Sequence, residues 1–441
     1  MLRRARLEGA RLAQCKLTGA DLSDLRALEI DMAECLLIDR RFWEKHGGVL
    51  VIAGDDHAAK SSTLPHQTEH VFKALMMPVL APAGIQEYLE YGLHGFALSR
   101  YSGCWVACKA LTDTVETSSS VEVDPFAVQT LIPGAADFPL PADGLNLRWP
   151  DPPLVQEKRL LHHKLYAALA YCRLNKLNRT VIDSPNAKLG IITSGKSYLD
   201  VRQALDDLGI DEATAAAIGL RLYKVGMVWP LEAEGVRKFA EGLDEILVIE
   251  EKRQFLEYQL KEELYNWRPD VRPNVLGKFD EAEGDFSGGE WSLPNPSART
   301  LLRANADLSP AIIARAIAKR LKKMGGVPED VMSRIDAQLA ILTAQDQSMQ
   351  TLLTQGTAGA ERQPWFCSGC PHNTSTKVPE GSRAMAGIGC HFMSIWMDRA
   401  TVGFTQMGGE GVPWVGQQPF SKDQHMFANL GDGTYFHSGL L

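Results

Sequence analysis

The sequence contains no long hydrophobic run and no block of basic residues. No apolar run reaches the roughly eighteen residues of a membrane span, so no interaction with a membrane is expected. The formal net charge is -8, and no basic block suggests a general affinity for nucleic acid. Met1-Leu2-Arg3-Arg4 is basic, but Leu then alternates with Arg, Glu and Gln, so the continuous apolar core of a signal peptide is missing.

Cysteine is also scarce. The 8 cysteines in 441 residues are unevenly spaced and do not form the framework of a disulfide-rich secreted protein. A reducing, cytoplasmic compartment is therefore expected, where a CxxC pair more often binds metal or does redox work. With 45% hydrophobic and 23% charged residues the composition is that of an ordinary globular protein, and the length predicts two or three domains.

Residues 1–43 carry a repeat with a period of five. Apolar residues recur at every fifth position, at Leu7, Leu12, Leu17, Leu22, Ala27, Met32, Leu37 and Phe42. This period fits neither a helix nor a strand, but it fits a four-sided coil in which each unit of five residues makes one side. The segment resembles the pentapeptide-repeat family, which forms a right-handed quadrilateral β-helix. The alternative is a Leu-rich helix of chance periodicity, and neither structure suggests catalysis.

The middle of the chain alternates strand and helix signals, which predicts parallel sheets with helices on their faces. The expected strands are 49–53, 78–82, 189–193, 221–225 and 245–251, and the expected helices are 66–77, 85–95, 160–175, 198–208 and 232–241. Gly54-Asp55-Asp56-His57 follows the first strand, where open α/β sheets place ligands, although the aspartates could equally cap a helix. Cys104 and Cys108, four residues apart, are expected to be core thiols.

Clusters of Gly, Pro and polar residues divide the rest of the chain. They predict a boundary at 133–156 and a long loop at 281–309. Helices are expected at 310–323 and 328–343, and the polar segment 344–362 is expected to be a flexible approach to the final block.

Residues 190–197 match the phosphate-binding P-loop pattern G-x-x-x-x-G-K-[ST] letter for letter. In a P-loop the first Gly follows the strand, so that successive backbone N–H groups can curl round phosphates. Here Gly190 precedes Ile191-Ile192, two β-branched residues that belong inside a strand. A nucleotide-binding enzyme is therefore kept only as a competing hypothesis.

The final block concentrates potential metal ligands. Cys367 and Cys370 form a CxxC pair, and Cys390 follows in a Gly-rich segment. Three thiolates suggest either a zinc site closed by His372 or His391 or a cubane iron–sulfur cluster that needs a fourth Cys, with inert thiols as the alternative. Spacing alone slightly favours zinc.

Gly431-Asp432-Gly433-Thr434 follows the predicted strand 426–430. Glycine on both sides lets the backbone turn sharply and approach a phosphate, and Asp supplies a hard oxygen for a cation such as Mg²⁺. The tripeptide alone is also a common turn.

The final block resembles the 2-oxoacid:ferredoxin oxidoreductases, and within them the long fused bacterial form of indolepyruvate ferredoxin oxidoreductase. The segments that carry the resemblance are Phe366–His372, Gly387–His391, Met407–Gly411 and Asn429–Gly439. The resemblance covers roughly 46–441. It implies an α/β fold with several parallel-sheet units, of thiamin-diphosphate-binding and transketolase-C-like type, behind the short N-terminal quadrilateral β-helix.

The resemblance also implies a domain order. The expected parts are a pentapeptide-repeat-like segment at 1–44, a partial pyrimidine-type thiamin-binding domain at 46–135, a transketolase-C-like domain at 157–280, a linker with helices at 281–362, and the start of the diphosphate-binding domain at 363–441.

The implied cofactors are thiamine diphosphate, Mg²⁺ and a [4Fe-4S] cluster, which replaces the preference for zinc. Gly389, Gly431, Asp432, Gly433 and Thr434 would bind the coenzyme, with Asp432 on Mg²⁺. The implied cluster ligands are Cys367, Cys370 and Cys390. No catalytic residue is assigned.

The implied reaction is oxidative decarboxylation of an aryl pyruvate, with ferredoxin as electron acceptor, CoA as acyl acceptor and a homo-oligomer as the complete enzyme. The fourth cluster Cys, a metal-binding Asn and the activating Glu of the family pattern are not found. A fragment that does not turn over alone is therefore expected, and a non-catalytic, repeat-headed interaction protein is the second alternative.

Overall fold

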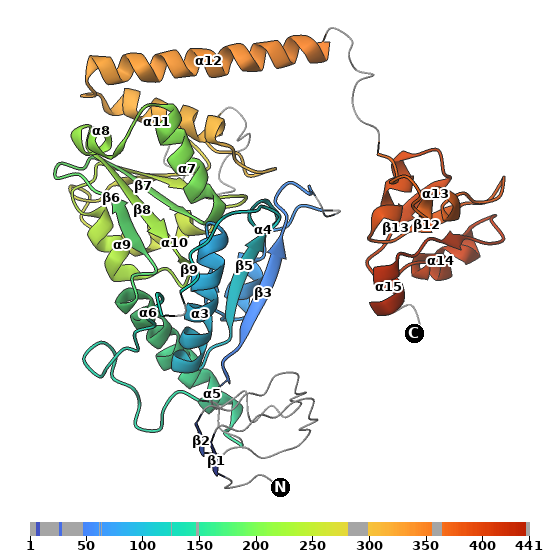
Figure 1. Cartoon of the computed structure of the whole chain (residues 1–441), viewed down its shortest axis with the longest axis horizontal. Helices are drawn as coiled ribbons and strands as arrows, with labels where there is room; N and C mark the ends of the chain where they lie inside the picture. Colours follow the sequence, from blue (N-terminus) through green and yellow to red (C-terminus); the bar gives the residue numbers. More distant parts are fainter. Residues whose placement is uncertain are drawn as a thin grey trace. The chain divides into compact units, whose positions relative to one another are not determined.

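The computed structural model describes residues 6–8, 26–28, 47–60, 62, 64–124, 126–146, 150–280, 299–354 and 364–437. The chain divides into two compact units (Figure 1). Unit 1 consists of residues 1–60 and 65–342, and unit 2 of residues 61–64 and 343–441. Within the described residues, no helix combines the length and the apolar character needed to cross a membrane.

The first sheet of unit 1 has the strand order β3-β5-β4-β9. Its strands are β3 (Leu50–Asp55), β4 (Val79–Leu80), β5 (Val106–Leu111) and β9 (Met227–Trp229). Strands β3, β5 and β4 are parallel, and β9 joins them antiparallel from much later in the chain. The sequence predicts β3 and β4 but not β5 or β9. The helices of this region are α2 (Glu69–Ala74), α3 (Ile85–Ser102) and α4 (Thr112–Val115).

Helix α3 does not end near Gly95, where the sequence predicts its end, but at Gly103 in the left-handed conformation. Gly95 lies inside the helix, and a Cβ there would be 2.6 Å from Leu50 Cδ1. The glycine thus allows the helix to pack closely on β3 instead of ending it. Cys104 and Cys108 lie in a loop and in β5, not on a helix, and both are buried core thiols as expected.

The second sheet of unit 1 has the order β11-β10-β7-β8-β6. Its strands are β6 (Arg179–Ile182), β7 (Leu189–Ser194), β8 (Leu220–Val225), β10 (Glu245–Ile249) and β11 (Asn274–Leu276). Strands β11, β10, β7 and β8 are parallel, and β6 runs antiparallel to β8 at the edge. The central position of β7 explains its run of buried aliphatic residues.

Four helices lie around the second sheet: α7 (Gly195–Asp207), α8 (Glu212–Ala217), α9 (Ala233–Ala240) and α10 (Leu256–Leu264). Helices α7 and α9 match predicted helices with small shifts, and α8 and α10 were not predicted. The expected helix 160–175 begins earlier, as α5 (Pro153–Arg159), continues through a π-helical segment (Leu160–Lys164) and ends as α6 (Leu165–Leu174).

Two helices follow the segment 281–298. Helix α11 (Pro310–Met324) packs on α7, and its Ile313, Ile317 and Leu321 belong to the core beside the second sheet. Helix α12 (Glu329–Thr354) extends well beyond 343, so the prediction of a flexible segment from Ala344 is wrong as far as Thr354. This stretch contains no Gly or Pro, so nothing in its backbone interrupts the helix.

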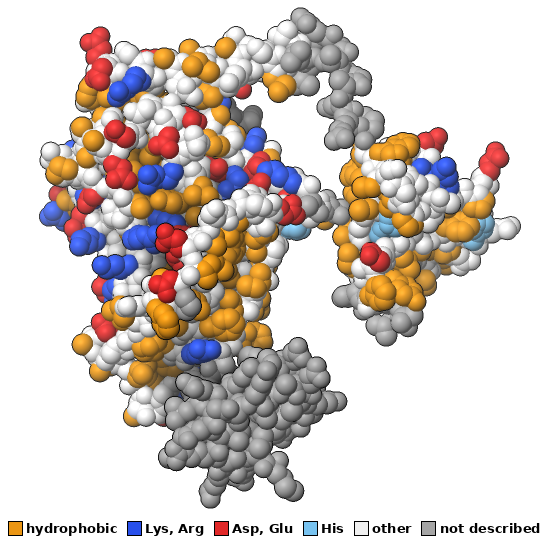
Figure 2. All heavy atoms as spheres, in the orientation of Figure 1, with side chains coloured by type: hydrophobic (Ala, Val, Ile, Leu, Met, Phe, Trp, Pro, Cys, Tyr) orange, Lys and Arg blue, Asp and Glu red, His pale blue; other side chains and the backbone are white. Residues whose placement is uncertain are grey.

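Unit 2 is built on a small parallel sheet with the order β13-β12-β14. Its strands are β12 (Ala384–Ala386), β13 (Thr401–Phe404) and β14 (Phe427–Ala428), and its helices are α13 (His372–Ser375), α14 (Val412–Gln417), α15 (Asp432–His437) and two 3₁₀ segments (Cys390–Trp396 and Gln418–Phe420). Large apolar side chains such as Phe420 (92% exposed) and Phe436 (85%) remain on its surface, and hydrophobic side chains are prominent on the face of unit 2 shown in Figure 2.

The repeat at the amino terminus is described only in two short strands. Strand β1 (Arg6–Glu8) pairs in parallel with β2 (Arg26–Leu28), so that residue 7 lies opposite residue 27. A coil with four sides of five residues would produce this offset of twenty. The rest of residues 1–46 lies outside the described residues, so the quadrilateral β-helix stays a prediction.

Candidate functional site

The glycine-rich segments of the final block meet at one edge of the sheet in unit 2. Strands β12 and β14 are neighbours and parallel, so their carboxyl ends lie side by side. Gly387–His391 follows β12, and Asn429–Thr434 follows β14. Residues more than forty positions apart are thereby brought together, at the edge where parallel sheets usually bind ligands.

His391 fills the space between these segments. Its side chain is completely buried, and its Nε2 accepts a hydrogen bond of 3.0 Å from the Gly387 N–H. A Cβ at Gly389 would lie 2.8 Å from the ring, and a Cβ at Gly431 would lie 3.2 Å from it. Both glycines are therefore required by close packing on the imidazole. Burial, together with the nearby His372, lowers the pKa of His391, so the ring is neutral near pH 7.

Glu410 joins the third glycine-rich segment to the other two. Its Oε1 accepts a hydrogen bond of 2.5 Å from Thr434 Oγ1, and its Oε2 accepts one of 2.7 Å from the Gly408 N–H. A Cβ at Gly387 would overlap the Glu410 carboxylate. The sequence pattern marked the segment around Glu410 but did not predict this role.

Asp432 lies on the surface at the start of α15. Its Oδ1 accepts a hydrogen bond of 2.9 Å from the adjacent Gly433 N–H. The nearby Asn429 is 9% exposed, and its Nδ2 has no hydrogen-bond partner among the described residues. The five residues predicted to bind the coenzyme thus lie on two adjacent turns, with one exposed carboxylate and unsatisfied polar groups around them.

The cysteines are not gathered into a metal site. Cys370 N–H donates to the Cys367 carbonyl at 3.0 Å, so the CxxC segment forms the expected turn. Cys367 and Cys390 are exposed and Cys370 is half-buried. Among the described residues, no group of three or more His, Cys, Asp or Glu side chains could hold a metal ion. No zinc site is therefore formed among the described residues, and His391 Nε2 already accepts a hydrogen bond from the Gly387 N–H.

The P-loop hypothesis for residues 190–197 is wrong. Gly190 lies inside β7, paired with Ile246 on one side and Arg221 on the other. A Cβ at Gly190 would be 2.7 Å from Phe239 Cζ, so the glycine makes room for α9 and does not curl round a phosphate. Lys196 is held by Asp200 (2.6 Å) and lies near Glu251.

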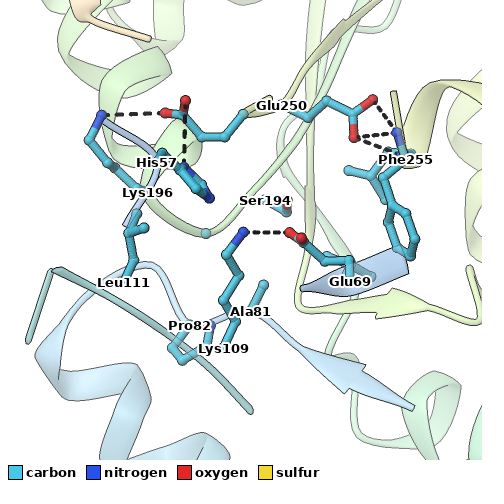
Figure 3. A pocket seen from close by; sticks show the side chains of 14 residues that line it. His57, Glu69, Ala81, Pro82, Lys109, Leu111, Ser194, Lys196, Glu250 and Phe255 are labelled. Carbon is cyan, nitrogen blue, oxygen red and sulfur yellow. Dashed lines mark hydrogen bonds and ion pairs between the residues drawn. The ribbon is translucent and has the colours of Figure 1, made fainter. Parts of the chain in front are cut away.

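Unit 1 contains a pocket that sequence patterns did not predict as a whole (Figure 3). It encloses about 460 Å³ free of protein atoms, counting the part open to solvent. His57, Lys109 and Lys196 line it, together with acidic residues from α2 and from the loop after β10. The only sequence signals were the polar run that ends in His57 and the acids at the end of the 245–251 segment.

The family model and the curated relatives that match this sequence are all indolepyruvate oxidoreductases. Residues 178–352 match the family model of the indolepyruvate ferredoxin oxidoreductase middle domain. The chain is 23% identical to the indolepyruvate oxidoreductase subunit IorA of Methanothermobacter thermautotrophicus over 411 residues, covering 89% of this chain and 56% of that protein. It is 26% identical to the IorA subunit of Pyrococcus horikoshii, covering 90% and 57%.

The chain thus spans about half the length of the curated relatives that it matches. Among solved structures, a 2-oxoglutarate:ferredoxin oxidoreductase from Magnetococcus marinus is 14% identical, with a TM-score of 0.37 over 64% of this chain and 50% of that one. That score is too low to establish a shared fold. The family model and the curated relatives together support, at low identity, a relation of this chain to the indolepyruvate ferredoxin oxidoreductases.

Proposed function

We propose that the chain carries part of a thiamine diphosphate-dependent 2-oxoacid:ferredoxin oxidoreductase acting on an aryl pyruvate such as indolepyruvate. Ferredoxin would accept the electrons and CoA the acyl group. The observation that carries the proposal is the convergence of Gly387–His391, Met407–Gly411 and Asn429–Thr434 at the carboxyl edge of the unit 2 sheet. The match of residues 178–352 to the middle domain supports the choice of family.

The residues at this edge fit a magnesium diphosphate group. Gly389 and Gly431 keep the backbone free of side chains, and Asn429 Nδ2 and His391 Nδ1 are buried polar atoms without a partner among the described residues. Such orphaned atoms usually have a partner that the protein alone does not supply. Asp432 offers an exposed carboxylate, the ligand type that Mg²⁺ prefers.

Each of these groups would have a defined task. Asp432 would hold Mg²⁺, and the backbones of Gly431 and Gly433 would lie against the diphosphate. Glu410 would fix the turn through Thr434, and the neutral His391 would keep the two glycine turns at their separation. When bound, thiamine diphosphate supplies the electron sink for decarboxylation.

The iron–sulfur cluster has a weaker basis. Among the described residues no group of three or more His, Cys, Asp or Glu side chains could hold a metal ion, so the geometry adds no support for a cluster and no electron path follows from it. The assignment of Cys367, Cys370 and Cys390 as cluster ligands stays a prediction that rests on the family resemblance.

Calorimetric titration of the full chain with thiamine diphosphate tests the proposal. We expect binding that requires Mg²⁺ and that weakens about tenfold or more in Asp432→Asn, because a neutral amide is a poorer ligand than a carboxylate. Asp398→Asn is the matched control, since Asp398 is an exposed aspartate of the same unit. Failure of the chain to bind, or equal binding by both variants, would contradict the proposal. A viologen-linked assay of the chain with indolepyruvate and CoA tests the separate expectation that the chain alone does not turn over, which measurable turnover would contradict.

A further inference from the structure

The pocket in unit 1 lies at the carboxyl ends of strands from both of its sheets. His57 follows β3, Lys109 lies in β5, Ser194 ends β7, and Glu250 and Glu251 follow β10. The apolar wall comes from Ala81, Pro82, Leu111, Val228, Phe255 and Leu256. Figure 3 shows His57, Lys109 and Glu69 around the same space, with Lys109 directed at Glu69. This pocket belongs to unit 1 and shares no residue with the glycine turns of unit 2.

The amino end of α7 supplies the first hydrogen-bond donors. The helix has 13 residues and begins at Gly195, and the side chain of its preceding residue Ser194 makes no capping hydrogen bond. The first N–H groups of a helix have no partner within the helix, and they carry a partial positive charge. Ser194, Gly195 and Lys196 all line the pocket, so this end of the helix faces it.

His57 supplies the observation that points independently to a ligand. Its side chain is 1% exposed, and neither ring nitrogen has a hydrogen-bond partner among the described residues. Glu251 Oε2 lies 3.7 Å from Nδ1, which favours the tautomer with its hydrogen on Nδ1. Nε2 then carries a lone pair and can accept a hydrogen bond. Buried polar atoms normally have a hydrogen-bond partner, so the unpartnered Nε2 of His57 indicates that a ligand could supply one.

Lys109 adds a charged donor that is 8% exposed. Its Nζ contacts Glu69 Oε1 at 2.5 Å and Asp55 Oδ2 at 3.2 Å, which accounts for two of its three N–H bonds. These carboxylates hold the pKa of Lys109 above its ordinary value despite burial, so it keeps its charge.

The acidic groups of the pocket are engaged, with one exception. Glu251 receives the Leu308 N–H at 2.9 Å and lies 3.4 Å from Lys196 Nζ, and Glu250 accepts the backbone N–H groups of residues 255–257. Glu69 Oε2 alone among the pocket carboxylate oxygens is buried without a hydrogen-bond partner in the part of the chain described. The pocket therefore combines donors at Lys109 and the start of α7 with two free acceptors, Glu69 Oε2 and His57 Nε2.

We propose that this pocket binds a phosphate group that carries a proton on one oxygen. The donors at Lys109 and the start of α7 suit the phosphate oxygens, and Glu69 Oε2 and the unprotonated His57 Nε2 are the two acceptors for the protonated oxygen. Sulfate is fully ionised at neutral pH and cannot donate to Glu69, so the site would select phosphate over sulfate. The ligand is either free phosphate or the terminal phosphate of an organic monoester.

Titration of the full chain with inorganic phosphate, glycerol phosphate and sodium sulfate tests the site. We expect phosphate to bind at least tenfold more tightly than sulfate, because an unpaired Glu69 facing a sulfate oxygen is repulsive. Binding of inorganic phosphate alone identifies the free anion, and tighter binding of glycerol phosphate identifies the monoester. Equal binding of phosphate and sulfate, or no binding of any of the three, would overturn the proposal.

Two variants report on the named groups. His57→Leu should weaken phosphate binding about tenfold or more through loss of one acceptor for the protonated oxygen, whereas His162→Leu, at an exposed histidine, should leave it unchanged. Glu69→Gln should bring the affinities for phosphate and sulfate together, because the amide can donate to sulfate. Thermal unfolding without ligand shows that each variant is folded. Full phosphate selectivity in folded Glu69→Gln would exclude the assigned role of Glu69.

Discussion

Substitution of Gly190 by alanine distinguishes a packing glycine from a phosphate-binding glycine. Gly190 lies in the central strand β7, where the missing side chain makes room for Leu243 and Phe239, which are 4% and 1% exposed. An added Cβ would lie 2.7 Å from Phe239 Cζ, well inside van der Waals contact. Because both neighbours are enclosed in the core, they cannot move away without disturbing others.

Overpacking of this kind costs about 1–3 kcal/mol. For a unit of this size such a loss corresponds to a fall in melting temperature of roughly 2–6 °C. Thermal unfolding should be combined with hydrogen exchange, because unfolding of a chain with two units need not be a single transition. The loss of protection should be localised to peptides that contain β7 and α9.

Gly92→Ala is the matched control. Gly92 lies inside α3, and a Cβ there would meet no atom within 4 Å. Alanine should therefore stabilise the protein by roughly 0.5–1 kcal/mol through its higher helix propensity. A neutral or stabilising effect of Gly190→Ala would refute the packing argument, as would stabilisation of the wild-type protein by ATP that the variant loses.

Three further predictions concern single groups. Arg320 is 2% exposed and bonded to Glu245 (2.6 Å) and Asp280 (2.7 Å), so Arg320→Met should cost about 3–5 kcal/mol in chemical denaturation by removing the buried cation that these two carboxylates share. The pKa of His57 is lowered, by burial first and then by Lys109, so on acidification the histidine of the unfolded chain is protonated before that of the folded chain. The free energy of unfolding should therefore fall as pH drops below about 6.5 in phosphate-free buffer, and less steeply in His57→Gln. Cys390→Ser should lower the iron content of anaerobically prepared protein if the cysteines bind a cluster, and iron-free wild-type protein would reject that assignment.

The strand and helix pattern of unit 1 was largely predictable because its central strands are buried on both faces. Continuous aliphatic runs such as 189–193 have no other common explanation when glycine or polar residues bound them. The edge strands β6, β9 and β11 were missed, because they are short and their pairing depends on partners far along the chain. The central strand β5 was missed as well, because Lys109 interrupts its apolar run. The end of α3 was misplaced because a glycine that permits close packing looks the same in sequence as a glycine that ends a helix.

The candidate sites were predictable only in part, for a related reason. A short motif identifies residues on one turn, such as Asp432 and its two flanking glycines. It does not identify what the fold places beside that turn. His391 and Glu410 acquire their roles only when β12 and β14 pair. His57 and Lys109 are separated by some fifty positions and meet because β3 and β5 are neighbours.

The two glycine motifs differ in their position relative to the strand. Gly190 precedes the buried residues of β7, and its missing side chain serves the contact with α9. Gly431 follows β14 and lies at the carboxyl edge, where its missing side chain makes room for the ring of His391. By the same criterion, the part of the P-loop-like sequence that could contact a phosphate is its end, Gly195-Lys196, which follows β7 and begins α7. That end lines the pocket with His57 and Lys109, so the discarded nucleotide motif and the proposed phosphate site share only the residues that lie beyond the strand.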